Sequence, residues 1–189
     1  MKDNRKTQSS RRAALPWLLG LPALAAAAIA VIGPRKLWEK TVGSDAGDLD
    51  FSADNLGELL GEKPNVGLAA PNGFFGPGLA GRVNHIVPDY QASADDLFVA
   101  VKAAALSLPN VQLIEQNFAS SSLRFVRFSP TMGFPDTINI VLTERPEGTS
   151  FVAAARARVG YSDLGMNAKL LRELINAVDQ QIRAASPAS

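Results

Sequence analysis

The sequence predicts an α+β domain in which an antiparallel sheet carries two amphipathic helices on one face. Four strand-like runs follow one another between residues 111 and 159 with short turn-forming links, and such links favour antiparallel pairing. One amphipathic helical pattern precedes these runs and another follows them, so both helices can bury their apolar stripes on the same sheet. The expected order over residues 82–185 is β-α-β-β-β-β-α, preceded by an N-terminal transmembrane or signal helix.

The domain is expected to open with a strand over residues 82–87, followed by a helix that begins at Ser93. Ser93 and Asp96 have the spacing of a capping box, although Asp replaces the usual Glu, and Pro109 ends the helix. The apolar residues of this helix recur at helical spacing: Leu97, Phe98, Val101, Ala104, Ala105 and Leu108.

The four strand runs cover residues 111–116, 122–128, 137–143 and 150–159. The link from Arg145 to Gly148 has the turn chemistry of a hairpin. When the apolar side chains of these strands face the helices, the other sheet face carries polar side chains, namely Arg124, Asn139, Arg156 and Arg158. This second face is therefore expected to be partly open.

The last helix is expected from about residue 164 to residue 184. Its apolar stripe is formed by Leu170, Leu171, Leu174, Ile175, Val178 and Ile182. Ser162 or Asp163 can cap its start, and a carboxylate at that position also complements the helix dipole.

The N-terminal region has the pattern of a membrane anchor or an export signal. Residues 1–12 are basic, and residues 13–32 hold no charge for 20 positions, which as a helix spans roughly 30 Å, the thickness of a bilayer core. Arg11 and Arg12 give a twin-arginine-like signal, and small residues at 28–30 offer a cleavage site. The run Arg35-Lys36-Leu37-Trp38 has the pattern of an interfacial anchor, which favours an uncleaved membrane anchor at residues 13–33. The alternatives are a cleaved export signal and a buried helix of a soluble protein.

Charge bias predicts which side of the membrane the domain occupies. Five bases precede the apolar segment and three follow it closely, so the N-terminus is expected in the cytoplasm. The rest of the chain is then expected on the periplasmic or lumenal side.

Residues 34–81 are expected to form an acidic and Gly/Pro-rich linker. Residues 44–62 hold six acids and no base, with a short helix expected at 55–60 that Asp54 would cap. Residues 64–81 are dense in Gly and Pro and predict irregular backbone. Phe74 and Phe75 lie within this stretch, and either tuck under the domain or contact a partner or the bilayer.

Composition excludes several classes of site. The chain has no Cys and one His, which excludes disulfides, thiolate metal sites and multi-histidine metal sites. Residues 1–43 carry eight bases and two acids, a net +6, whereas residues 44–189 carry 11 bases and 16 acids, a net −5. The basic N-terminal region is suited to contact anionic lipid headgroups. The acidic remainder of the chain argues against nucleic-acid binding. No cofactor is expected.

The stretch from Arg158 to Asn167 is the most distinctive motif. It holds Arg158, Gly160, Tyr161, Asp163, Gly165 and Asn167 at fixed spacing, followed by Lys169. In this pattern residues 82–183 resemble the domain of unknown function 1499 family. The chain departs from the family at Ala154-Ala155 and at the Phe134-Pro135-Asp136 element, and Pro64-Asn65-Val66 lacks the family's Cys. The resemblance implies a fold and an exported or membrane-associated context, with no reaction attached.

The candidate binding residues are Arg158, Tyr161, Asp163, Asn167 and Asp136. Asn167 either locks the helix onto the preceding strand or, with Arg158 and Tyr161, lines a pocket for an anion or polar ligand. Arg158 and Asp163 are expected to pair across the turn, and Asp136 to cap a turn. No catalytic or metal-ligating residue is assigned.

These features favour a membrane-tethered extracytoplasmic accessory domain that binds a membrane-protein complex, with the bilayer itself as a partner. One alternative is a binder of a small apolar ligand such as a lipid or pigment. A more remote one is a hydrolase that uses Asp136, Asp163 and His85, although their spacing matches no recognisable catalytic motif.

Overall fold

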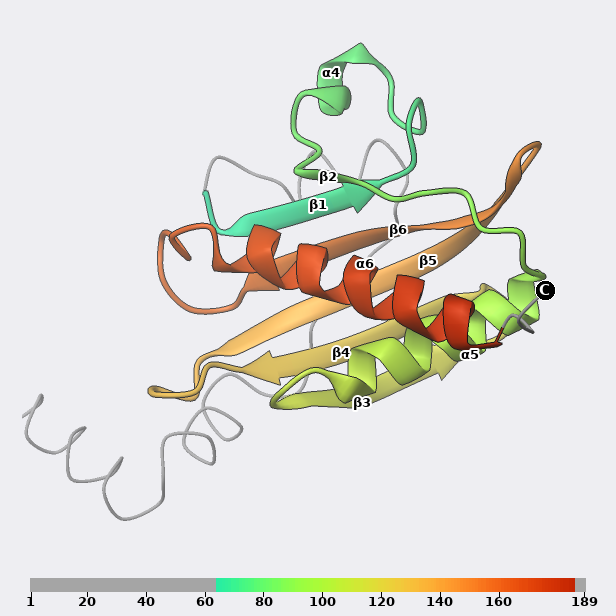
Figure 1. Cartoon of the computed structure of the whole chain (residues 1–189). Helices are drawn as coiled ribbons and strands as arrows, with labels where there is room; N and C mark the ends of the chain where they lie inside the picture. Colours follow the sequence, from blue (N-terminus) through green and yellow to red (C-terminus); the bar gives the residue numbers. More distant parts are fainter. Residues whose placement is uncertain (1–63, 186–189) are drawn as a thin grey trace, which may run out of the picture. The chain divides into compact units, whose positions relative to one another are not determined.

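The computed structural model describes residues 64–185, which form a six-stranded sheet with two long helices on one face (Figure 1). The helix expected at 13–33 and the acidic stretch 44–62 lie outside the described residues. The strands are β1 (Val66–Ala70), β2 (His85–Ile86), β3 (Val111–Asn117), β4 (Ser122–Phe128), β5 (Pro135–Arg145) and β6 (Gly148–Ala157). The helices are α4 (Pro77–Ala80), α5 (Ala94–Ser107) and α6 (Met166–Ala185).

The sheet order is β2-β1-β6-β5-β4-β3, and every neighbouring pair is antiparallel except β1 and β2. The predicted α+β class and the antiparallel run from β3 to β6 are therefore confirmed. Within residues 64–185, no helix has the length and apolar character that crossing a membrane requires.

The hairpin between β5 and β6 forms where the sequence predicts it. Arg145 pairs with Gly148, whose φ of 141° lies in a region that side chains avoid. A Cβ on Gly148 would lie 2.5 Å from the carbonyl oxygen of Tyr90, so only glycine fits this corner.

Strand β1 differs from the sequence-based expectation. Residues 64–81 are predicted to be irregular, but Val66–Ala70 form a buried strand between β2 and β6. The strand predicted at 82–87 shortens to β2, an edge strand parallel to β1, so the sheet has six strands where five were expected. A five-residue run that contains Gly67 and is followed by Pro71 is too short for periodicity to identify, and its pairing with β6 makes it a strand.

The main core lies between the sheet and the two long helices. Strand side chains such as Phe125, Ile138 and Phe151 meet Leu97 of α5 and Leu171 of α6. The fully buried residues of this layer confirm both predicted apolar stripes: Leu97, Val101, Phe125, Ile138, Ile140, Phe151, Leu170, Leu171 and Leu174.

A second, smaller cluster covers part of the opposite sheet face. Leu68 and Val152 belong to it, and the loop between β1 and β2 packs on it through Phe74 and Phe75. The two rings meet edge to face, with their centroids 4.9 Å apart. Of the two alternatives for this pair, the structure shows the tucked arrangement.

Candidate functional site

The junction between β6 and α6 holds the distinctive motif, and its backbone is unusual. Gly160 and Gly165 have φ angles of 96° and 79°, and Leu164 has a φ of 54°. A branched side chain in the left-handed region costs roughly 1–2 kcal/mol and persists only where its surroundings fix it. The junction therefore needs specific contacts to hold it.

Asp163 supplies the first of these contacts. One carboxylate oxygen accepts a hydrogen bond from the backbone N–H of Gly165 at 3.1 Å, and the other accepts from the N–H of Asn167 at 2.7 Å. The Ser162 hydroxyl accepts from the N–H of Leu164 at 3.2 Å. Asp163 thus caps α6 as predicted, because it satisfies N–H groups that have no partner within the helix.

Asn167 and Asn65 supply the second contact. Asn167 is fully buried, and its side-chain N–H donates to the carbonyl of Asn65 at 2.9 Å. The Asn65 carbonyl also accepts from the N–H of Ala157 at 3.0 Å, while the Asn65 side chain donates to the carbonyls of Ala157 and Gly160 at 3.2 and 3.4 Å. Asn167 therefore locks the start of α6 onto the strands, which is the first of its two predicted roles.

Gly67 and His85 complete the attachment of α6. A Cβ on Gly67 would lie 2.7 Å from the backbone nitrogen of Ala168 and 2.7 Å from the carbonyl carbon of Asn167. The helix can approach β1 only because that side chain is missing. The Nε2 atom of His85 lies 2.7 Å from the carbonyl oxygen of Ala168, and because a carbonyl can only accept, Nε2 is the donor.

Asp136 and Arg127 form a buried pair of charged neighbours on the helix side of the sheet. They are register partners on β5 and β4, and each lies two residues from a helix-facing core residue, Ile138 or Phe125. Burial raises the pKa of Asp136 to about 6, with the positive charge of Arg127 acting against this and the negative charge of Asp163 adding to it. Asp136 lies inside β5, so the turn-capping role expected for it is wrong.

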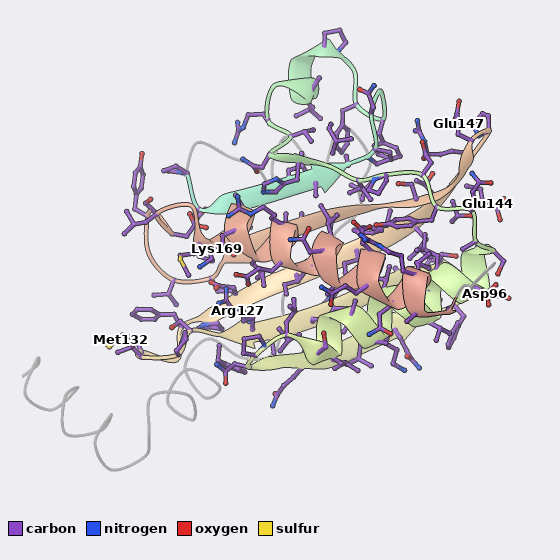
Figure 2. All side chains as sticks on the ribbon, in the orientation of Figure 1. Asp96, Arg127, Met132, Glu144, Glu147 and Lys169 are labelled. Carbon is purple, nitrogen blue, oxygen red and sulfur yellow. The ribbon has the colours of Figure 1, made fainter. Side chains whose placement is uncertain are left out.

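Figure 2 shows Arg127 and Lys169 toward the end of the sheet where α6 begins, and Glu144 and Glu147 toward the opposite end. The sequence does not predict that Arg127 faces the helices. Its neighbours Val126 and Phe128 are both apolar, so the polar and apolar residues of β4 do not alternate regularly. Asn65 has one signal, the Pro-Asn element that the chain shares with the family it resembles.

The junction exposes three large apolar or aromatic side chains. Tyr161 is 67% exposed and Leu164 is 92% exposed, and Met166 beside them is also exposed. Met132 is exposed on the loop between β4 and β5, which Figure 2 shows at the same end of the sheet. We call Tyr161, Leu164 and Met166 the junction tip.

The structure thus separates residues that one prediction placed in a shared pocket. Asn167 is fully buried in the first turn of α6, whereas Tyr161 lies on the surface. Arg158 is half-buried, and its backbone N–H donates to the carbonyl of Pro135 at 3.1 Å. Across residues 64–185, no group of three or more His, Asp or Glu side chains is placed to hold a metal ion.

Comparison with known proteins matches the folded part of the chain to a family. The family model described as "Protein of unknown function (DUF1499)" matches residues 68–178. Among solved structures, the X-ray crystal structure of protein MLL2253 from Mesorhizobium loti is 11% identical with a TM-score of 0.31. The match covers 40% of this chain and 60% of that one. Comparison with curated proteins gave no match.

Proposed function

The chain belongs to the DUF1499 family of proteins of unknown function, and from its own residues we propose that it is a membrane-tethered extracytoplasmic binding domain. Residues 13–33 act as the tether, and the folded part binds and stabilises a membrane-protein assembly on the periplasmic or lumenal side. Cleaved export of the same binding domain is the alternative form of this proposal.

The junction tip is the observation that carries the proposal. Large apolar side chains exposed together on a monomer are typical of interaction sites, and aromatic side chains are enriched at the centres of interfaces. Tyr161 and Leu164 are exposed on a loop whose backbone is fixed by Asp163 and Asn167. A fixed loop loses little conformational entropy when it binds, which favours affinity.

The linker gives the tip access to a partner in the same membrane. Residues 34–63 connect the proposed tether to the folded part of the chain. The tip can therefore meet the extramembrane part of a protein in the same membrane.

The interior of the domain favours protein binding over the two other functions considered. Large side chains such as Phe125, Phe151 and Leu171 are fully buried between sheet and helices, where an apolar ligand would have to displace them. Asp163 and His85 make hydrogen bonds to the start of α6, so both already have structural roles that compete with a role in hydrolysis.

Leu164→Ser tests the proposal. We expect the free energy of unfolding to change by less than about 0.5 kcal/mol, because the side chain is almost fully exposed. In native membranes solubilised with mild detergent, wild-type protein should sediment as an assembly and the variant as a lone chain. Urea denaturation measures the stability, and sedimentation velocity with immunodetection measures the assembly.

Val99→Ser on α5 is the matched control, since Val99 is also an exposed aliphatic residue, at 64% exposure, on a different element. It should leave the assembly intact. Sedimentation of the wild-type protein as a lone chain, or of L164S as a full assembly, would refute the proposed role of the tip.

A further inference from the structure

The sheet face opposite the long helices holds an ordered set of polar and apolar side chains. Arg124 pairs in register with Asn139, and Val126 with Thr137, which in turn pairs with Arg156 of β6. These five residues alternate along β4, β5 and β6 with the core residues of the helix side, so they share the second face. We call them the arginine face. The sequence-based expectation for Arg124, Asn139 and Arg156 on this face is thus confirmed.

Two buried polar atoms on the arginine face lack partners. The Oγ1 atom of Thr137 and the Nδ2 atom of Asn139 have no hydrogen-bond partner within the described part of the chain. The Oδ1 atom of Asn139 is satisfied by the Nε–H of Arg124 at 3.1 Å, so the unused group on Asn139 is a donor. Buried polar groups are almost always paired, and both atoms here can donate to a carboxylate.

The arginine face also carries buried apolar residues. Val126 and its neighbour Phe128 are buried, although α5 and α6 lie on the other side of the sheet (Figure 1). The loop that carries Phe74 and Phe75 packs on a different part of the second face, over β1 and β6. Buried apolar residues, arginine side chains and unused hydrogen-bond donors thus lie together on this face. An acidic, partly apolar segment has the chemistry that complements such a surface.

We propose that residues 44–62 of the same chain bind the arginine face. This segment carries six acids and no base, which complements Arg124 and Arg156. Leu56, Leu59 and Leu60 have the spacing of one helical face and can cover Val126. Glu115 is already paired with Arg124 at 3.3 Å, which shows that this guanidinium accepts carboxylate partners.

The chain geometry allows this contact within one molecule. Val66 pairs in register with Arg156, so the chain enters the sheet beside the arginine face. From β1 to β4 there are three strand spacings, about 14 Å in all, which roughly five extended residues cover. Acidic residues such as Glu58 can therefore reach Arg124.

Thiol labelling of the full chain in detergent tests the proposal. The chain has no natural Cys, so the thiol of V126C is unique, and V99C provides an exposed reference. We expect maleimide to label V126C about tenfold more slowly than V99C, because bound residues 44–62 shield it. The combined change D54N/E58Q/E62Q should raise the V126C rate about fivefold, and higher salt should act in the same direction by screening the charges.

The control neutralises three acids outside the segment, D95N/E144Q/E147Q, and should leave the V126C rate unchanged. Labelling of V126C as fast as V99C would refute the proposal, as would slow labelling that D54N/E58Q/E62Q leaves unaltered. A V126C rate that falls as protein concentration rises would instead identify a second copy as the occupant. None of these outcomes involves the junction tip, so they are separate from the test with L164S.

Discussion

Replacing Gly67 by Ala is expected to lower the free energy of unfolding by about 3 kcal/mol, at the upper end of what added core volume usually costs. The new Cβ would lie 2.7 Å from backbone atoms of both Asn167 and Ala168. Backbone atoms of a helix cannot move aside as the end of a flexible side chain can, so α6 must shift away from β1. Urea denaturation followed by circular dichroism measures the loss.

Gly78→Ala is the control for this prediction. Gly78 lies in α4, where an added Cβ meets nothing within 4 Å, and alanine favours a helix over glycine. G78A should therefore be as stable as the wild-type protein or slightly more so. A G67A variant with the urea midpoint of G78A would show that α6 does not depend on close contact with β1.

Replacing Asp136 by Asn is expected to stabilise the protein above pH 6 and to have little effect at pH 4. Burial raises the pKa of the Asp136 carboxyl from an ordinary value of 3.8 to about 6 in the folded state. The folded state therefore holds this proton more tightly than the unfolded state does. Wild-type stability should fall as the pH rises from about 4 to about 6, because ionising the buried group opposes folding.

The amide side chain of the D136N variant does not titrate, so the advantage of D136N over the wild type should grow across that window and then stay constant. Its upper limit is roughly 2–3 kcal/mol. Urea midpoints at several pH values between 4 and 8 give the difference curve. Val99→Ser, at an exposed position of α5, removes no ionisable group and should give a flat curve. A D136N curve that is also flat would show that the Asp136 carboxyl is not perturbed.

Much of the fold could be predicted because its signals are local. The apolar stripe of α6, the Asp163 cap and the hairpin before Gly148 each depend on residues close together in the chain. Helical spacing and turn chemistry can be recognised without knowing what packs against them. The sharing of the second face by Arg124 and Asn139 follows from simple alternation along the strands.

The parts that sequence could not supply depend on distant partners. β1 becomes a strand through its pairing with β6, and Val66 and Arg156, which pair there, are far apart in the chain. Asn65 acts through Asn167, 102 residues away, and no local pattern marks that contact. The charge of Arg127 matters because the sheet register places it beside Asp136. Residues of the candidate site that act through long-range contacts were therefore the ones missed.

Site-specific photocrosslinking at the Leu164 position in intact membranes tests the central claim most directly. A photoreactive amino acid at this position should give a discrete protein adduct in the membrane fraction at native abundance, because the junction tip is proposed to contact a partner there. The same amino acid at Val99, exposed on α5, should give none. The account would be contradicted if this protein were found outside the membrane and exported fractions. It would also be contradicted if the protein remained a lone monomer and gave no adduct at Leu164.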